Sequence, residues 1–537
     1  MYSSVLTTTV YGPVRGRAAG GVVAFKGIRY GADTAGYRFQ PPRPPAPWTD
    51  AVNAFEFGPT APQDHPDTGT DRAANPFLQM IGLTDNLPES EDCLFVNVWT
   101  PGTAAQARDA GAQPPARPVL VWVHSGGYSS NSGSSPSIDG AHLAAEHDLV
   151  VVTFNHRLNV LGYTQVVDPA AEPGSPYAAS GNVGQLDIVA ALEWVRDNIA
   201  AFGGDPSNVT LAGQSGGAMK ISLLLAMPAA QPLFHRAILQ SGTAVRAFTP
   251  AEALSTAARL RAATGLTEDA APQALAALPL KELMRAYTKV SRGMTDFGPL
   301  VDGTVVPSQP FSAESVALSG DKPLIVGDMD AEAGLFLFGQ REALTALGRE
   351  EVVAHLARAV GAQEAVRLVE AIEASRPGIG PYELAVQVVS DGIFAGPTRV
   401  GAEARAAGAS APTWRYRNTL RTPAADGALI SPHELDVALT FGNTEVAAGL
   451  NGNTPEAREV SRILGATWAA FAHSGDPANA TIRIWPAYDE KRKTLLISPA
   501  PRVTDDSDDG VDGADGAALA VAGELSDRLI DWLGVFD

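Results

Sequence analysis

One serine of the chain lies in a setting that could make it a nucleophile. Residues 213–217 (GQSGG) match the pattern G-x-S-x-G around Ser215. The pattern alone is common, but here an apolar run at 209–212 precedes it and a helix-forming stretch follows from Ala218. A strand, a tight turn and a helix in this order hold a serine hydroxyl at the tip of the turn, where it can attack an acyl carbon.

A second glycine-rich segment could stabilise the negative charge that such an attack creates. Residues 124–128 (HSGGY) follow a buried apolar run, so backbone N–H groups of this loop can approach a ligand closely. We expect Gly126 and Gly127 to donate to an oxyanion, with the N–H of Gly216 completing the set. His124 is interpreted as a structural residue and Tyr128 as a residue of the pocket.

The nucleophile also needs a base, and histidine is the usual one because its pKa lies near 7. Where this serine motif occurs, the chain order is Ser, then Asp or Glu, then His. Among the nine histidines this order leaves His355, His433 and His473. The first lies in a helical pattern and the last at the expected end of a helix. His433 lies in a proline-marked loop, where catalytic bases are commonly presented, so we expect it to be the base.

The carboxylate that would orient this histidine is left open by spacing alone. Asp328, Asp330 and Glu332 all follow the apolar run 324–326 closely. Any of them could accept a hydrogen bond from the histidine and stabilise the imidazolium.

The elements that must position these groups alternate along the chain. Apolar runs typical of strands buried on both faces are separated by helix-forming stretches, which predicts an α/β fold with a mostly parallel central sheet flanked by helices. The expected strands are 94–99, 118–123, 149–154, 209–212, 237–240 and 324–327, and the expected helices are 186–199 and 218–226. Residues 104–117 are expected to form an exposed connection.

We expect one domain over residues 1–537, with helical insertions at 246–300 and 340–395 that cover the active site. Both insertions are rich in Ala, Leu and Glu. The acidic stretch 505–515 resembles a calcium loop, but Gly516 stands where a bidentate Glu is needed, so it is interpreted as a solvated loop. No metal and no cofactor is predicted.

Composition narrows the possible partners and the location. The net charge of −20 argues against binding to nucleic acid. The single cysteine, Cys93, allows no disulfide within the chain. No leader-like N-terminal segment and no apolar run of membrane-spanning length is present, so we expect no membrane association and a cytoplasmic protein. The oligomeric state is left open.

With these motifs in hand, the chain resembles the type-B carboxylesterase family, which includes bacterial esterases of the p-nitrobenzyl type and the cholinesterases. The resemblance covers nearly the whole chain. Besides the segments around Ser215 and Gly126, it rests on 25–30 (FKGIRY), 38–42 (RFQPP), 90–99 (SEDCLFVNVW), 155–158 (NHRL), 240–242 (QSG) and 471–477 (FAHSGDP).

The resemblance implies the α/β-hydrolase fold and hydrolysis of a small-molecule carboxylic ester through an acyl-enzyme, without a cofactor. It selects Glu332 as the acid, because the family carries Glu five residues after the Gly that ends this strand. It supports His433, since an acidic residue, Asp436, stands three positions later. Ser241 resembles the family's buried serine near the triad.

The chain departs from the family at three positions of the site. Gln214 stands where the family usually has Glu, Gly216 where it has Ala, and Ser125 where it has the first Gly of the oxyanion loop. The loss of a carboxylate at Gln214 implies weaker stabilisation of a charged histidine, whereas the other two changes remove no backbone donor.

The resemblance to cholinesterases is weaker. Residues 64–89 contain no tryptophan of the kind that binds quaternary ammonium in those enzymes. Phe297 aligns with an acyl-pocket aromatic and Thr295 falls where a second would stand, which implies a wider acyl pocket than that of an acetyl specialist. A serine amidase or peptidase remains an alternative. A binding module without catalysis is disfavoured, because the serine and the histidine are both present.

Overall fold

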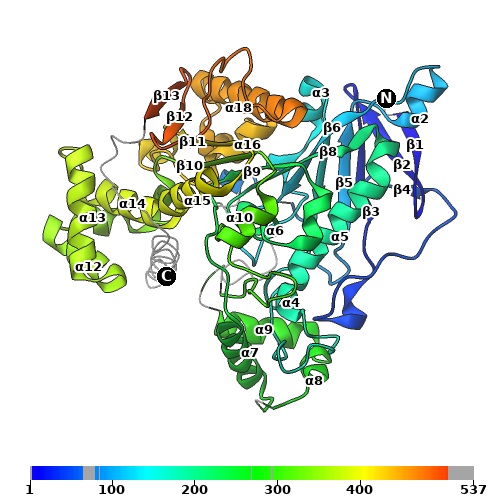
Figure 1. The fold of residues 1–537 in the computed structure, drawn as a ribbon, viewed down its shortest axis with the longest axis horizontal. Coiled ribbons are helices and arrows are strands. Elements are labelled where there is room, and N and C mark those ends of the chain that lie inside the picture. Colours follow the sequence, from blue (N-terminus) through cyan, green and yellow to red (C-terminus); the bar gives the residue numbers. More distant parts are fainter. Residues whose placement is uncertain are drawn as a thin grey trace.

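A single large sheet forms the centre of the molecule (Figure 1). The computed structural model describes residues 3–505 except 64–78, 84, 268, 292, 294 and 295. In spatial order the described strands are β1 (Ser3–Thr9), β2 (Gly12–Ala19), β3 (Val22–Arg29), β5 (Phe95–Thr100), β7 (Val150–Phe154), β6 (Arg117–Val123), β8 (Gly204–Gln214), β9 (Arg236–Gln240), β10 (Leu324–Met329), β11 (Thr413–Asn418), β12 (Lys493–Ile497) and β13 (Arg502–Asp505). A short strand, β4 (Val52–Asn53), pairs with β2.

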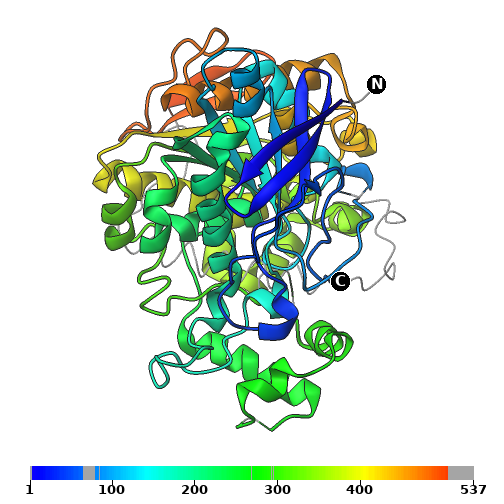
Figure 2. The same ribbon diagram turned by 90° about the vertical axis from the view of Figure 1, so that its right-hand side faces the viewer.

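Seven neighbouring strands, from β7 to β12 in the spatial order, run parallel to one another. The outer pairs are antiparallel. In Figure 2 the N-terminal hairpin β1–β2 lies at the sheet edge nearest the viewer. The predicted mostly parallel sheet is confirmed, and the six predicted strands correspond to β5, β6, β7, β8, β9 and β10.

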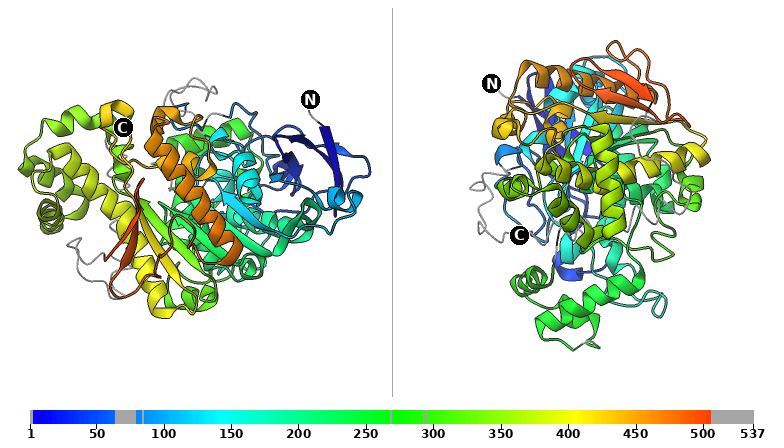
Figure 3. Two further views of the ribbon diagram at one scale, coloured as in Figure 1. Left: turned by 90° about the horizontal axis from the view of Figure 1, so that it is seen from above. Right: turned by 90° about the vertical axis from the view of Figure 1, so that its left-hand side faces the viewer.

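Helices cover both faces of this sheet because consecutive side chains of its central strands are apolar and point to opposite faces. Val119, Val121 and Val123 of β6 join one core with α5 (Val183–Asn198) and α6 (Gly216–Leu225). Leu120 and Trp122 join the opposite core with α16 (Leu435–Phe441) and α18 (Pro455–Ser474). Figure 3 shows α18 crossing this second face. The expected helices 186–199 and 218–226 correspond to α5 and α6.

The remaining described helices are short or lie outside these two layers, except α15 (Gly396–Gly408), whose Ala402 joins the core on the side of α5 and α6. They are α2 (Ala104–Asp109), α3 (Ala141–His147), α4 (Asn159–Gly162), α7 (Pro250–Thr264), α8 (Pro272–Ala276), α9 (Leu280–Val290), α10 (Ala313–Ser319), α11 (Arg341–Thr345), α12 (Arg349–Val360), α13 (Ala362–Ser375), α14 (Pro381–Ser390), α15 and α17 (Ala448–Asn451).

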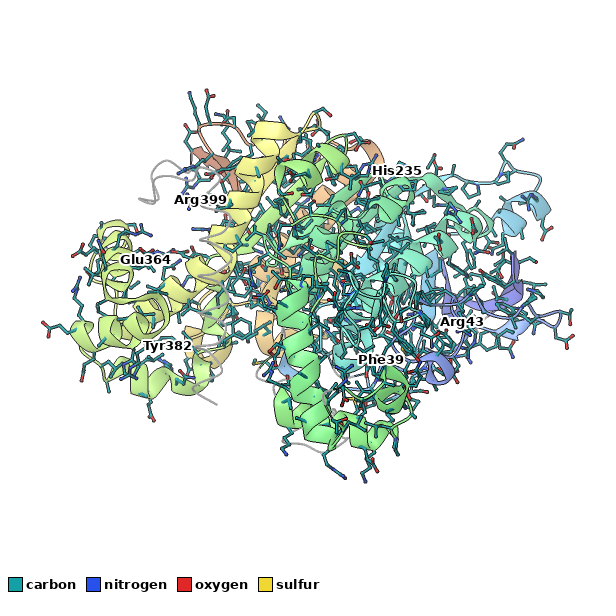
Figure 4. All side chains as sticks on the ribbon, turned by 60° about the horizontal axis from the view of Figure 1, so that its bottom comes forward. Phe39, Arg43, His235, Glu364, Tyr382 and Arg399 are labelled. Carbon is teal, nitrogen blue, oxygen red and sulfur yellow. The ribbon has the colours of Figure 1, made fainter. Side chains whose placement is uncertain are left out.

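Two groups of helices project beyond the sheet. Helices α7–α9 share an apolar core with Phe39, and α11–α14 have a separate one. In Figure 4, Glu364 and Tyr382 mark the second group, while Phe39 lies beside the first. The two groups fall within the predicted insertions 246–300 and 340–395. Their covering of the active site stays a prediction.

Two expectations about the elements need correction. Residues 104–117 are not only a connection, because Thr103 and Gln106 form a reciprocal capping box that starts α2. Strand β11 was not expected, because Arg415 and Arg417 break its apolar pattern. The structure places both arginines beside Asp328 of β10, with Arg415 buried and Arg417 partly buried. The acidic stretch 505–515 lies outside the described residues apart from Asp505.

Two further sequence expectations concern the cysteine and the membrane. Cys93 is free and fully buried. Among the described residues, no helix combines the length and the apolar character that a bilayer crossing requires.

A buried ion pair ties the segment after β7 to α5 and to the N-terminal region. Arg157 donates to both carboxylate oxygens of Asp187, at 2.8 and 2.7 Å, and to the carbonyl of Gln40 at 2.9 Å. The two side chains of the pair are 2% and 0% exposed. Removing one partner would leave the other charge buried and uncompensated.

We therefore predict that Asp187→Ala lowers the free energy of unfolding by about 3–5 kcal/mol, measured by urea denaturation. A matched control is Glu373→Ala, which removes the exposed pair with Arg349 and should change stability by less than about 1 kcal/mol. Equal effects of the two substitutions would contradict the role assigned to the buried pair.

Candidate active site

Ser215 occupies a strained turn between β8 and α6. Its backbone φ and ψ are 53° and −125°, which few residues other than glycine adopt. The turn also requires small neighbours: an ideal Cβ on Gly216 would lie 2.1 Å from the carbonyl oxygen of Gly127, and one on Gly217 would lie 2.0 Å from that of Val123. Ser215 itself is only partly buried, so its hydroxyl is presented at the carboxyl end of the sheet.

The oxyanion loop leaves the sheet beside this turn. β6 and β8 are parallel, and Val123 is in register with Gly213, so the two loops start side by side. Gly126 and Gly127 have φ angles of +90° and +58°, and their N–H groups donate to no described residue. The first helical hydrogen bond of α6 runs from Met219 to Ser215, which leaves the N–H of Gly216 ahead of the helical ladder.

His433 is bonded to Glu332 across the end of β10. The imidazole Nδ1 lies 2.6 Å from Oε2 of Glu332, whose Oε1 accepts from the N–H of Met329 at 2.7 Å. The backbone N–H of His433 also donates to the carbonyl of Glu332 at 3.1 Å. The two side chains are 4% and 0% exposed. This arrangement holds the neutral ring with its proton on Nδ1 and a lone pair on Nε2.

The other two carboxylates after β10 have different partners. Asp328 lies 2.8 Å from Arg417 and 3.6 Å from Arg415, and Asp330 lies 2.7 Å from Arg376. Of the three, Glu332 is the one bonded to a histidine. The geometry thus distinguishes Glu332 from the two aspartates as the partner of the histidine, a choice that the spacing in the sequence left open.

The remaining candidate histidines lie elsewhere. His355 is on α12 with Nδ1 near the carbonyl of Glu351, and His473 ends α18 with Nε2 near the carbonyl of His147. His124 is buried at the start of the oxyanion loop, and its ring lies 4.6 Å from that of His156. None of these three is bonded to Glu332.

Electrostatics favour proton uptake by His433. Burial lowers its pKa, but the nearby negative charge and hydrogen bond of Glu332, with smaller contributions from Glu434 and Asp436, raise it above the ordinary value of 6.5. Asp436 is itself fully buried, and burial raises its pKa to about 7 although Gln240 donates to it. The histidine therefore lies in a region of negative potential.

Ser215 and His433 are brought to the same place without a direct hydrogen bond between them among the described contacts. Nε2 of His433 instead lies 3.2 Å from the amide nitrogen of Gln214, the residue before the serine. The amide donates to the lone pair that a base would use. Gln214 is fully buried, and its Oε1 has no partner among the described residues.

Sequence reasoning missed Glu434. This residue has a φ of 69°, unusual for a side chain other than glycine, and is 8% exposed. Burial raises the pKa of its carboxyl, while His433 and a hydrogen bond from the Ser125 hydroxyl lower it. The contact links the histidine loop to the oxyanion loop at a position where the chain departs from the resembled family. No pattern in the sequence connects these two residues.

Two aromatic rings that flank His433 were also missed. The centroids of Phe336 and Phe394 lie 5.2 and 4.7 Å from that of the imidazole. Phe394 is presented by a π-helix, Asp391–Ala395, between α14 and α15. Such single-turn π segments frequently occur at functional sites, but they leave no clear mark in the sequence.

The other predicted site residues are buried close to this framework. The ring centroid of Tyr128 lies 5.2 Å from that of Tyr163, and the ring centroid of Phe297 lies 5.1 Å from that of Tyr287, in the core shared with α7–α9. Ser241 has a φ of 51°, and its hydroxyl is buried with no partner among the described residues. Thr295 lies outside the described residues. No group of three metal-binding side chains occurs in the described part of the chain.

Comparison with known proteins places this geometry in context. The model of the carboxylesterase family matches residues 3–510. The para-nitrobenzyl esterase of Bacillus subtilis (strain 168) is 32% identical over 93% of this chain and 96% of that protein. The phenmedipham hydrolase of Pseudarthrobacter oxydans is 32% identical over 93% and 95%. A crystal structure of a Geobacillus stearothermophilus carboxylesterase superimposes with a TM-score of 0.78 at 33% identity, covering 94% of this chain and 98% of that one.

We predict that Glu332→Gln lowers the pKa of His433 below its ordinary value, because burial then acts without the main opposing charge. The pKa can be followed by NMR titration of the imidazole, with His433→Asn identifying its resonance. Glu434→Gln, which removes a weaker contribution, should lower the pKa by less. An unchanged His433 pKa in Glu332→Gln would contradict the electrostatic role given to this carboxylate.

Proposed function

Because the chain belongs to the carboxylesterase family, we propose that Ser215, His433 and Glu332 carry out its hydrolysis of carboxylic esters. The observation that carries this proposal is the 2.6 Å contact between Nδ1 of His433 and Glu332. The other ring nitrogen of His433 reaches Gln214, the residue next to Ser215. A base oriented by a carboxylate beside a serine on a tight turn is the arrangement that serine acyl transfer needs.

In the first step, Oγ of Ser215 forms a bond to the acyl carbon and its proton moves to Nε2 of His433. Gln214 must first yield this nitrogen to the serine. The electron pair of the carbonyl double bond moves onto oxygen, so a negative oxyanion and a positive imidazolium form together. The backbone N–H groups of Gly126, Gly127 and Gly216 donate to the oxyanion.

Collapse of this intermediate breaks the bond to the alkoxide, which leaves as an alcohol after taking the proton from His433. Water then attacks the acyl-enzyme and gives its proton to the same nitrogen. A second tetrahedral intermediate collapses, the proton returns to Ser215, and the carboxylic acid is released. Glu332 orients the imidazole throughout and stabilises its charged form.

The substrates we propose are esters of small molecules. One relative is named a para-nitrobenzyl esterase, which makes p-nitrobenzyl and p-nitrophenyl esters suitable first probes. We further propose that the two helical insertions border the substrate path, since Phe297 and Phe394 come from their ends. Tyr128, Gln214 and Ser241 are proposed to support the site without reacting.

We also propose a cytoplasmic protein that does not bind nucleic acid. The one cysteine, Cys93, is free and buried, which suits a reducing compartment. A net charge of −20 repels phosphate backbones.

We predict that Ser215→Ala lowers the hydrolysis of p-nitrophenyl butyrate by at least about 1,000-fold at neutral pH, as expected for loss of a triad member. The control is Ser207→Ala, which changes an exposed serine near the start of the same strand and should retain full activity. Full activity of Ser215→Ala would mean that another residue is the nucleophile.

A second prediction concerns the acyl group. With Phe297 as the acyl-pocket aromatic carried over from the resemblance, the pocket should accept chains longer than acetyl. We expect kcat/KM for p-nitrophenyl butyrate to equal or exceed that for the acetate, measured under identical conditions. A preference for acetate of about tenfold or more, equivalent to about 1.4 kcal/mol, would overturn this expectation.

A further inference from the structure

A lysine is buried beneath the oxyanion loop. Lys220 lies on α6, five residues after Ser215, and its side chain is 0% exposed. Its Nζ donates to the carbonyl of His124 at 3.5 Å, and its own backbone carbonyl accepts from the amide of Gln185 at 3.1 Å. The side chain therefore ends at the residue with which the oxyanion loop begins.

No carboxylate of the described chain forms an ion pair with this ammonium. Its titratable neighbours are His124 and His156. Both ring nitrogens of His156 lack a partner among the described residues, and burial together with Lys220 holds its pKa well below 6.5, so this ring is neutral. The residue after His156, Arg157, is paired with Asp187.

An ammonium in this position is costly to keep charged. Burial lowers the pKa of Lys220 to about 7. The first turns of a helix also disfavour a positive charge, because the helix dipole is positive at that end. If Lys220 only filled space, an apolar side chain of the same length could replace it without loss of stability.

The position of Lys220 on α6 relates it to the proposed oxyanion donors. Residues four apart share a helix face, so Lys220 lies below Gly216. That face meets the oxyanion loop, since an ideal Cβ on Gly216 would lie 2.1 Å from the carbonyl oxygen of Gly127, and one on Gly217 would lie 3.0 Å from that of His124. The ammonium thus lies between α6 and the start of the oxyanion loop.

We propose that Lys220 is a positioning residue for the oxyanion, whose buried ammonium has no carboxylate partner at rest and meets its counter-charge only in the tetrahedral intermediate. This inference rests on the proposed function of Ser215 and Gly126–Gly127. A charge that is uncompensated in the free enzyme and compensated in the transition state lowers the barrier without tightening substrate binding. Its effect belongs in kcat and leaves KM nearly unchanged.

The sign of the pH dependence follows. Lys220 is charged below a pKa of about 7, so its contribution to kcat/KM is present at lower pH and disappears as the pH rises through that value. His433 must be neutral to act as the base, and its raised pKa gives the acidic limb. Three carboxylates, Glu332, Glu434 and Asp436, face His433 rather than Lys220. They raise the pKa of His433 and so affect the acidic limb of the pH profile.

The test compares Lys220→Met with Lys220→Gln in p-nitrophenyl butyrate hydrolysis between about pH 6 and 9. We expect both variants to lose about tenfold in kcat near pH 6, less than the loss of a direct oxyanion donor, with KM nearly unchanged. The difference from wild type should shrink toward nothing near pH 9. Lys220→Met should unfold at the same or a higher urea concentration, because an apolar chain replaces a buried amine.

Three outcomes would overturn the proposal. They are unchanged kcat in Lys220→Met, a loss that is the same at every pH, and full activity in Lys220→Gln, which keeps a hydrogen-bond donor without the charge. If neither variant folds, wild-type calorimetry with phenylboronic acid at about pH 8 decides. At that pH the free acid is still mostly neutral and trigonal, so the anionic adduct and the imidazolium of His433 form together without net proton uptake. Uptake that approaches one proton per site then reports the charging of Lys220, and no uptake would refute the charge. Failure of the underlying mechanism is distinct, because Ser215→Ala would then stay active and the boronate would not bind.

Discussion

The site depends on the close approach of two backbone segments at the ends of neighbouring parallel strands. β6 and β8 are paired so that Val123 and Gly213 are in register, and the loops that follow touch through main-chain atoms. No Cβ fits at Gly216 or Gly217 in that contact. The contact therefore requires glycine at position 216, because a methyl group there would overlap the carbonyl oxygen of Gly127.

A second constraint is the sorting of buried carboxylates by the cation that each one meets. Asp328 and Asp330 face arginines, which stay charged at any physiological pH, so these pairs are structural. Glu332 faces a histidine, whose proton can leave near neutrality. The identity of its partner thus distinguishes Glu332, the proposed catalytic carboxylate, from the two chemically similar aspartates.

Charge is distributed unevenly around the serine. Glu332, Glu434 and Asp436 lie on the side of His433, where the proposed reaction creates a positive imidazolium. Lys220 lies on the side of the oxyanion loop, where the proposed reaction creates a negatively charged oxygen. The charges around the serine are therefore opposite in sign to the two charges of the proposed intermediate. Ser125 and Gln214 connect the two sides, through contacts with Glu434 and His433 respectively.

The sequence by itself determined the alternating elements, the tight turn at Ser215 and the glycines after β6, because these features depend on residue types within a few positions. It also favoured His433 as the proposed base among nine histidines, from chain order and a proline-marked loop. Resemblance to a family was needed to select Glu332, because three carboxylates stand within five residues after one strand.

Only the tertiary structure decided which groups meet. Glu332 and His433 are 101 positions apart, Gln214 and His433 are 219 apart, and Lys220 reaches His124 across 96. Lys220 and Arg415 read as ordinary polar residues in their segments, and nothing local reveals that they are buried. Burial and partnership are set by how distant segments pack, and that packing sets the pKa values on which the chemistry of the site rests.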